Sequence, residues 1–280
     1  MMSLCLTTDF VSGTGSPQPA LQAIAQAGFT HVHWCHQWCT DFLYGPAEIA
    51  AIGLWLCEYH LAVNDVHGSA GLEKNWGSPR EYERQAGIEL VQNRIDFARA
   101  LESDVVIMHL PVEPAAEPER TFFWNRLRRS LDALHSYAKT RGVRLALENM
   151  ARDNFPTLRR VLAEYPPDYI GLCYDCGHGH IAGSGLTQLE ECKDRLLATH
   201  LHDNDGAKDL HWPPFTGTVD WPRLARIIAA SAYTKPCLSI ESTMQNVADK
   251  DQGAFVRQVY QAGQRFARMV ADHRAAATRG

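Results

Sequence analysis

The segment HLHDNDGAKDLH, at positions 200–211, concentrates three histidines and three aspartates in twelve residues. Imidazole nitrogens and carboxylate oxygens are ligands for divalent metal ions, so the segment has the composition of a metal site. A solvated polar loop has the same composition. The segment alone does not separate these alternatives, which depend on the residues that the rest of the chain brings to it.

Two glutamates elsewhere in the chain lie inside apolar runs. Glu148 ends the run RLALEN, and Glu241 ends the run LSIES. Burial of an unpaired carboxylate is costly, so each run predicts a cation or another polar partner. The motif YDCGH adds Asp175 and His178. A lone histidine at a strand end is more often a hydrogen-bonded structural residue than a ligand, so the histidines are informative only as a set.

Short apolar runs alternate with longer segments of helical periodicity. Apolar residues recur at steps of three and four within 88–101, 127–138 and 255–269, which indicates helices. The predicted strands are 4–8, 30–34, 61–67, 104–110, 143–149, 169–175, 196–202 and 236–241. Alternation of this kind indicates parallel strands with helical crossovers. Eight such units in 280 residues predict an α/β fold, a (β/α)8 TIM barrel that forms a single domain over 1–280.

A doubly wound open sheet is the alternative fold. It would need a glycine-rich phosphate loop after its first strand, and Gly13 and Gly15 lie there without the third glycine of that motif. The CYDC segment places Cys173 and Cys176 at the spacing of a zinc or redox pair. No second pair follows at zinc-ribbon distance, so buried free thiols are favoured.

TIM-barrel enzymes place their active sites at the carboxyl ends of the strands. The predicted third to eighth strands all deliver a histidine or a carboxylate to this rim. The candidate metal ligands are His67, His109, Glu148, Asp175, His178, His200, Asp209, His211 and Glu241. A set of nitrogen and oxygen donors predicts a divalent metal cofactor, with Zn²⁺ as the first choice and Mn²⁺, Co²⁺ or Fe²⁺ as alternatives.

Five motifs carry a resemblance to a known family. LALEN, YDCGHGH, HLHDNDG, DLHWPPFTGTVDW and LSIES resemble the xylose isomerase-like TIM barrels. That group includes sugar isomerases and epimerases as well as apurinic-site enzymes of the endonuclease IV type (AP endonuclease family 2). The resemblance extends over nearly the whole chain and implies two alternative chemistries.

The isomerases and epimerases hold one divalent ion with four residues. The matching positions here are Glu148, Asp175, His200 and Glu241. The resemblance implies that the two glutamates are a catalytic acid–base pair that moves a proton at the carbon beside a carbonyl, and that His178 contacts substrate. Many epimerases carry an arginine just after the histidine of strand seven. This chain has Gly206 and Lys208 in that neighbourhood, which leaves that substrate contact without its usual residue.

The endonuclease IV type holds three zinc ions with nine ligands. All nine candidate ligands of this chain have the residue type that the resemblance requires. In that chemistry a metal-activated water attacks phosphorus. The complete set of nine makes hydrolysis of a phosphate ester at a multinuclear site our first hypothesis. Isomerisation or epimerisation of a sugar or keto-sugar at one metal ion is the alternative.

The charge pattern makes nucleic acid an improbable partner. The net charge is −5, and no block rich in lysine and arginine stands out. We therefore expect a small-molecule substrate, either a phosphate ester or a sugar. Trp34, Trp38, Trp76 and Trp212 lie near strand ends, where they would either wall a pocket or pack over the barrel. The candidate substrate contacts are Trp34, Trp76, His202 and Trp212.

No run of 18 apolar residues occurs, and the start of the chain lacks a basic region followed by an apolar stretch. The sequence therefore predicts a cytoplasmic protein without a membrane span. It is compatible with a homo-oligomer.

Overall fold

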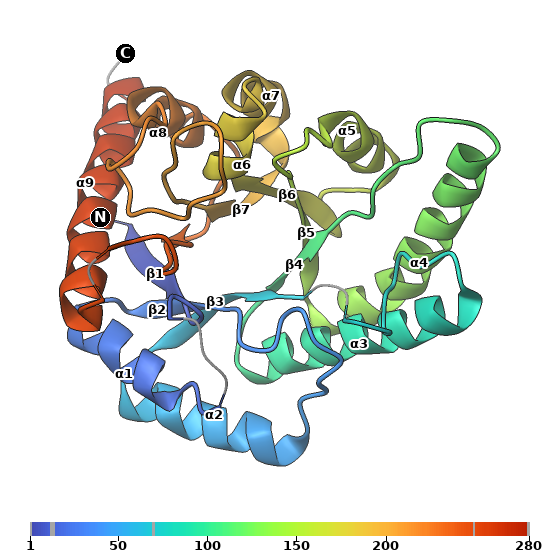
Figure 1. Ribbon diagram of the computed structural model, residues 1–280, viewed down its shortest axis with the longest axis horizontal. Helices are drawn as coiled ribbons and strands as arrows, with labels where there is room; N and C mark the ends of the chain where they lie inside the picture. Colours follow the sequence, from blue (N-terminus) through green and yellow to red (C-terminus); the bar gives the residue numbers. More distant parts are fainter. Residues whose placement is uncertain (1, 12–14, 69–70, 249, 279–280) are drawn as a thin grey trace.

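Eight parallel strands form the centre of the molecule (Figure 1). The computed structural model describes residues 2–11, 15–68, 71–248 and 250–278, so Gly13 of the glycine motif lies outside the described residues. The strands are β1 (Ser3–Thr7), β2 (His31–Trp34), β3 (Ala62–His67), β4 (Val105–His109), β5 (Arg144–Glu148), β6 (Ile170–Asp175), β7 (Leu196–His200) and β8 (Cys237–Ile240). Each predicted strand is confirmed, and its ends differ from the prediction by at most two residues.

The helices surround the strands on the outside (Figure 1). They are α1 (Gln18–Gln26), α2 (Pro46–Glu58), α3 (Glu81–Ala100), α4 (Glu119–Arg141), α5 (Phe155–Glu164), α6 (Cys176–Ile181), α7 (Gly185–Cys192), α8 (Trp221–Ala229) and α9 (Gln252–Ala277), with a 3₁₀ turn, η1 (Lys193–Arg195). The three predicted helical segments fall within α3, α4 and α9, apart from the last residue of the first, Leu101, which caps α3. Strand and helix alternate along the chain as the sequence predicts.

The sheet closes into a barrel. Its strands pair in the order β7-β6-β5-β4-β3-β2-β1-β8, so β7 and β8 form its two edges. The Leu201 N–H donates to the carbonyl of Ser239 at 3.0 Å, and the Glu241 N–H donates to the carbonyl of Leu201 at 3.1 Å. These bonds join the two edges just beyond the end of β7. The predicted TIM barrel is therefore confirmed, and the open doubly wound alternative is excluded.

The strand faces that carry the candidate ligands also carry a small apolar cluster. Side chains two residues apart on a strand share a face. Val105 and Ile107 therefore share a face with His109, and Ala146 shares one with Glu148. The apolar members belong to one buried cluster, completed by Cys173, Leu197 and Ala198. The barrel interior is thus apolar below and titratable at its carboxyl end.

Two predicted substrate contacts are wrong, because their side chains pack in the core. Trp34 is fully buried, donates from Nε1 to the Tyr44 hydroxyl at 2.9 Å, and lies 5.2 Å from the Phe97 ring of α3. Trp76 is 1% exposed, and its backbone abuts Gly87 so closely that a Cβ there would overlap it. Their neighbours lie on the helix side of the sheet and not in the barrel mouth.

In the part of the chain that the structure describes, no helix is both long enough and apolar enough to span a membrane.

Removal of the Trp34 side chain tests its packing role. We expect Trp34→Ala to lower the free energy of unfolding by about 3–5 kcal/mol, because it leaves a cavity between β2 and α3. Leu54 of α2 is 71% exposed, and Leu54→Ala is the control, with a change within about 0.5 kcal/mol. Urea denaturation followed by circular dichroism measures both. Equal midpoints for the two variants would contradict the packing role.

Candidate metal centre and active site

A cavity of about 510 Å³ lies at the carboxyl end of the barrel. Seven of the nine predicted ligands line it: His67, His109, Glu148, His178, Asp209, His211 and Glu241. The other two, Asp175 and His200, are fully buried beside them. Asp9, Trp38, Met150, Thr243 and Gln245 complete the lining. The structure therefore brings all nine predicted side chains together at the rim where the barrel fold places active sites.

His200 lies at the floor of this site, surrounded by carboxylates. Its Nδ1 atom is 3.1 Å from Oε1 of Glu148, 3.3 Å from Oε2 of Glu241 and 4.0 Å from Oδ2 of Asp175. In spite of these distances, neither ring nitrogen of His200 has a hydrogen-bond partner. A buried nitrogen that faces three carboxylates without bonding to any of them is the arrangement of a metal ligand. The four residues therefore fit a divalent ion.

The remaining predicted ligands form two groups around this floor. In the first, Nε2 of His109 is 3.0 Å and Nε2 of His67 is 3.7 Å from Oε2 of Glu148. In the second, Asp209 lies between two histidines, with Nε2 of His178 at 3.1 Å and Nε2 of His211 at 3.2 Å from its oxygens. Both groups face the cavity, so they are available to an ion or to a bound ligand.

The histidines keep the two glutamates ionised. Burial alone would raise the pKa of Glu148, but the neighbouring imidazoles of His200 and His109 hold that pKa well below its ordinary value. Burial would also raise the pKa of Glu241. The neighbouring His200 and the hydrogen bond with His33 outweigh burial, so that this pKa too is well below its ordinary value. Both glutamates are therefore carboxylates at neutral pH, which is the form that binds a cation.

Two polar residues fix the position of Asp175. The Asn149 side chain accepts a hydrogen bond from the Asp175 N–H at 2.8 Å and donates to the Asp175 carbonyl at 2.9 Å. Nε2 of His202 lies 3.0 Å from both carboxylate oxygens of Asp175, and its ring stacks on His211 at 3.9 Å. His202 is fully buried, and its contact with both oxygens orients the Asp175 carboxylate, a predicted metal ligand. We propose no direct contact between His202 and substrate.

The tryptophan that lines the cavity is Trp38. Its ring lies 4.5 Å from the His67 ring and 5.4 Å from the His109 ring. Trp212, a predicted substrate contact, does not line the cavity. Its backbone pairs with Asp203 and its Nε1 donates to the Asn246 carbonyl at 3.0 Å, so it ties two rim loops together.

Three further titratable residues lie at the site and were not among the predicted site residues. Asp9 follows β1 and lines the cavity. His33 on β2 and Asp65 on β3 are fully buried and joined by a 2.5 Å contact between Nδ1 and Oδ1. The signal that identified the glutamates was present, since Asp65 is also a carboxylate within an apolar strand run, AVNDVH.

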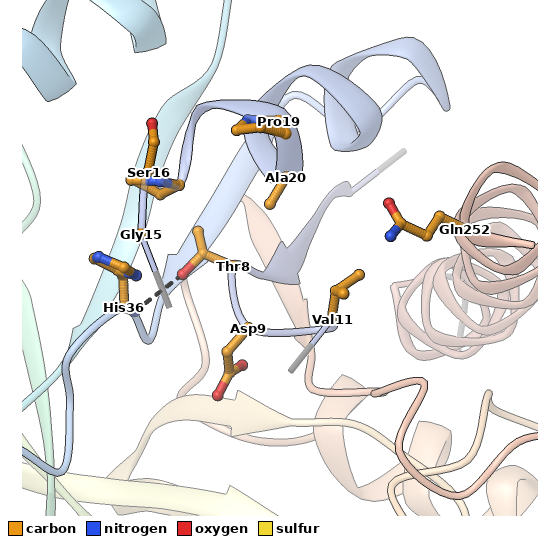
Figure 2. Close-up of a pocket in the computed structure, with 10 residues that line it drawn as sticks. Thr8, Asp9, Val11, Gly15, Ser16, Pro19, Ala20, His36 and Gln252 are labelled. Carbon is orange, nitrogen blue, oxygen red and sulfur yellow. Dashed lines mark hydrogen bonds between the residues drawn. The ribbon is translucent and has the colours of Figure 1, made fainter. Parts of the chain in front are cut away.

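A smaller cavity, of about 150 Å³, adjoins Asp9 on the side of α1 and α9 (Figure 2). Thr8 and Asp9 line it together with Ala20 of α1 and Gln252 of α9. The Thr8 hydroxyl accepts a hydrogen bond from the His36 N–H at 3.2 Å, which links the ends of β1 and β2. Asp9 therefore borders both this cavity and the larger one.

Most of the chain matches a known protein family. The model of the xylose isomerase-like TIM barrel family matches residues 21–268. The chain therefore belongs to this family, as the five motifs predict. An uncharacterized protein of Sinorhizobium fredii, y4fM, is 32% identical over 282 residues, which cover 91% of this chain and 90% of that protein.

More distant matches include proteins named for sugar chemistry. Fructoselysine 3-epimerase of Escherichia coli O157:H7 is 24% identical over 164 residues, which cover 56% of this chain and 59% of the enzyme. The solved structure of an L-ribulose 3-epimerase superposes with a TM-score of 0.78 at 18% identity and covers 99% of this chain and 97% of its own. A D-tagatose 3-epimerase-like protein gives 0.76 at 19% identity, with 97% and 99% covered. At these identities the solved structures establish the fold.

The first hypothesis, hydrolysis of a phosphate ester, is wrong. The similar proteins include several that are named as sugar 3-epimerases, and the comparisons favour the alternative that the sequence left open. The error came from counting ligand-type residues. A polar cavity that binds a sugar needs histidines and carboxylates as well, so residue type alone does not distinguish the two chemistries.

Gly177, at the start of α6, tests the support of Asp175. A Cβ at position 177 would overlap the His202 ring, which would have to leave Asp175. We expect Gly177→Ala to weaken divalent-metal binding about 10- to 100-fold, the usual effect of losing a residue that orients a ligand. Gly53→Ala in α2 is the matched control, since its Cβ would meet nothing closer than 3.7 Å. Competition titration of Co²⁺ measures both, and unchanged affinity in Gly177→Ala would show that His202 is dispensable.

Proposed function

We propose that this protein is a divalent-metal-dependent enzyme that epimerises a ketose-type sugar at the carbon beside the carbonyl. The observation that carries the proposal is the convergence of Glu148 and Glu241 on His200 in the floor of the cavity. Strands β5 and β8 bring the two carboxylates to one centre. The epimerases among the similar proteins support the same chemistry.

The proposed ligands of the metal ion are Glu148, Asp175, His200 and Glu241. The bound ion would polarise the oxygens of the sugar, which makes the neighbouring C–H more acidic. The unpartnered nitrogens of His200 and the ionised carboxylates around it are the observations that favour this set. We propose a divalent ion without assigning the element.

The two glutamates supply the proton transfers. Inversion at carbon requires a base that removes the proton on one face and an acid that returns a proton on the other. Glu148 is 1% exposed and Glu241 is 8% exposed, and both line the cavity. Because both carboxylates are ionised, either one can accept the proton of the sugar, and the direction of the reaction decides which. The other carboxylate must first take up a proton from water in the cavity, and it then returns this proton to the opposite face of the carbon. His178, whose Nδ1 is 3.4 Å from Oε1 of Glu148, would contact the substrate beside it.

The polar walls of the cavity suit sugar hydroxyls. His67, His109, Asp209 and His211 present ring nitrogens and carboxylate oxygens to it, and Trp38 adds one aromatic face. We propose that these residues bind hydroxyl groups. A cavity of about 510 Å³ has room for a monosaccharide with a substituent. The position after β7 where many epimerases carry arginine is occupied by a loop that contains Gly206 and Lys208, so we expect a different contact with the far end of the sugar.

Solvent exchange tests the proton transfer directly. We expect the metal-loaded protein to incorporate deuterium from D₂O into one or more ketoses at the carbon beside the carbonyl, as measured by proton NMR on a panel of free and amine-linked ketoses. Glu148→Gln should reduce kcat by a factor of about 100 or more, because an amide cannot accept the proton. Glu164→Gln, at an exposed ion pair on α5, is the control. If no ketose exchanges, the proposal is refuted.

Metal removal gives a second test. We expect treatment with a chelator to abolish exchange, and addition of one divalent ion to restore it, because the buried carboxylates need a cation to hold substrate oxygen. Elemental analysis of the active protein identifies the ion. Full activity in chelated protein that contains no metal would contradict the metal-dependent mechanism, although it would leave the glutamate pair in place.

A further inference from the structure

We propose that His33, Cys35 and Glu241 form a second cation site, which takes a thiophilic divalent ion such as Zn²⁺, at the β2–β8 side of the cavity. Neither His33 nor Cys35 takes part in the proposed proton transfers. The inference concerns metal binding and does not depend on the identity of the sugar.

The three donor atoms already lie at ligand-to-ligand distances. The Cys35 sulfur is 2.9 Å from Nε2 of His33 and 3.9 Å from Oε1 of Glu241. Nε2 of His33 and Oε1 of Glu241 are 3.6 Å apart. Metal–ligand bonds of about 2.0–2.3 Å in a tetrahedral zinc site place neighbouring donors roughly 3.3–3.7 Å apart. Each observed distance is within about an ångström of this range. The three residues are at most 8% exposed.

Asp65 prepares His33 to be a ligand. The 2.5 Å contact between Nδ1 of His33 and Oδ1 of Asp65 orients the ring, and the Asn64 side chain donates to the other carboxylate oxygen at 2.6 Å. A histidine that binds a metal through one nitrogen almost always donates its other N–H to a carboxylate or a carbonyl. The Asp65–His33 pair has this form, and Nε2 is the nitrogen that points to Cys35 and Glu241.

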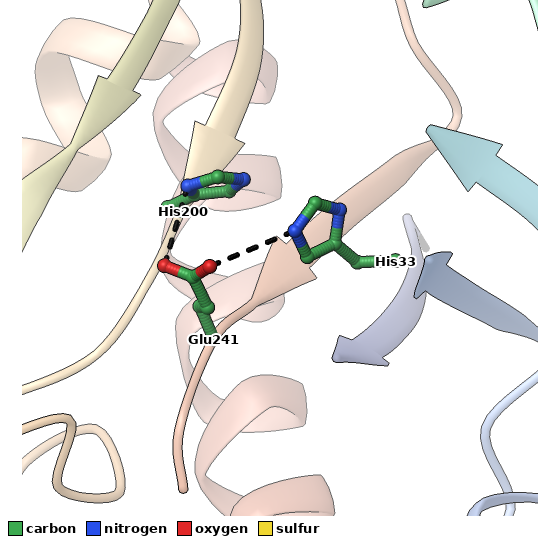
Figure 3. A group of neighbouring side chains, drawn as sticks. All are labelled: His33, His200 and Glu241. Carbon is green, nitrogen blue, oxygen red and sulfur yellow. Dashed lines mark ion pairs between the residues drawn. The ribbon is translucent and has the colours of Figure 1, made fainter. Parts of the chain in front are cut away.

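Glu241 presents one oxygen to each of two centres (Figure 3). Its Oε2 atom is 3.3 Å from Nδ1 of His200, on the side of the proposed catalytic ion. Its Oε1 atom faces His33, as the figure shows. The same oxygen lies 3.9 Å from the Cys35 sulfur. The carboxylate is therefore placed to bridge two ions. The sulfur of Cys35 makes the second position softer than the first, which favours zinc over manganese there.

The site has a route for entry and room for a fourth ligand. Cys35 lines a cavity of about 300 Å³ at the rim, together with Asp9 and Trp38. Its backbone N–H donates to the Thr8 hydroxyl at 2.9 Å, which fixes the start of the loop after β2. An ion that arrives through this cavity meets Cys35, whereas Glu241 is reached from the larger cavity, and water in either cavity can supply the fourth ligand.

Cobalt provides the probe, because a thiolate bound to Co²⁺ gives a near-ultraviolet charge-transfer band that nitrogen and oxygen ligands do not give. We expect the full chain, stripped with chelator and titrated with Co²⁺, to develop this band. Cys35→Ser should lose the band and about one bound ion per chain by elemental analysis. Asp65→Asn should weaken the thiolate-bound class about 10- to 100-fold.

Cys192→Ser is the matched control, since Cys192 is a buried thiol at the end of the outer helix α7. This variant should keep the band. The proposal is overturned if the wild-type chain shows no band or if Cys35→Ser retains it. Circular dichroism and thermal melting establish that each variant is folded. Because absorption is measured and not turnover, a missing band leaves the epimerase proposal standing, and an inactive enzyme leaves the band interpretable.

Discussion

The site depends on one electrostatic constraint, which is the burial of several carboxylates around a single imidazole. Glu148, Asp175 and Glu241 all have an oxygen within 4.0 Å of Nδ1 of His200, and all four side chains are nearly or fully buried. Three like charges at this spacing, away from water, repel one another strongly. The folded state is stable only if positive charge lies among these carboxylates. Histidines of the rim or a metal ion supply that charge.

The barrel makes such a concentration of charge possible. Parallel strands bring their carboxyl ends to one rim, so a single residue at the end of each strand reaches the same centre. The apolar cluster below, with Val105, Ile107 and Ala146, excludes water from the floor. Supports from the side, such as the paired hydrogen bonds between Asn149 and Asp175, hold each ligand in place. Rigidity of this kind suits a site that must present two carboxylates to one carbon.

Much of this could be read from the sequence, and the rest could not for physical reasons. Buried strands are short and apolar, so all eight were predictable. A glutamate at the end of such a run predicts a cation or another polar partner, because burial of an unpaired carboxylate is costly. The direction of a side chain is harder. Trp34 directly follows His33 on β2, and His33 faces the lumen of the barrel. Neighbouring residues of a strand point to opposite faces, so the Trp34 indole packs against Phe97 of α3. A register shift between Val32 and His33 makes this direction harder to predict from the sequence. Asp65 was missed although it obeys the rule that identified Glu148.

The number of ligand-type residues at the rim did not indicate the correct function, again for a physical reason. A histidine of the rim can serve an ion, a sugar hydroxyl or another protein side chain, and these uses differ in geometry and not in composition. His202 illustrates the point, since it has the residue type of a ligand yet holds Asp175 through both carboxylate oxygens. The three uses become distinct only when distances and burial are known.

The two proposed acid–base residues are not equivalent, and their surroundings show how. Glu148 has a histidine nitrogen close to each oxygen, with His200 at 3.1 Å from one and His109 at 3.0 Å from the other. The contacts of Glu241 are longer, at 3.3 Å to His200 and 3.9 Å to Cys35, and it is the more exposed carboxylate. Proton transfer on the Glu148 side must displace His109, whereas Glu241 can approach a substrate carbon without breaking a short contact. The barrel therefore supplies one carboxylate with two short histidine contacts and one with longer contacts, from two different strands.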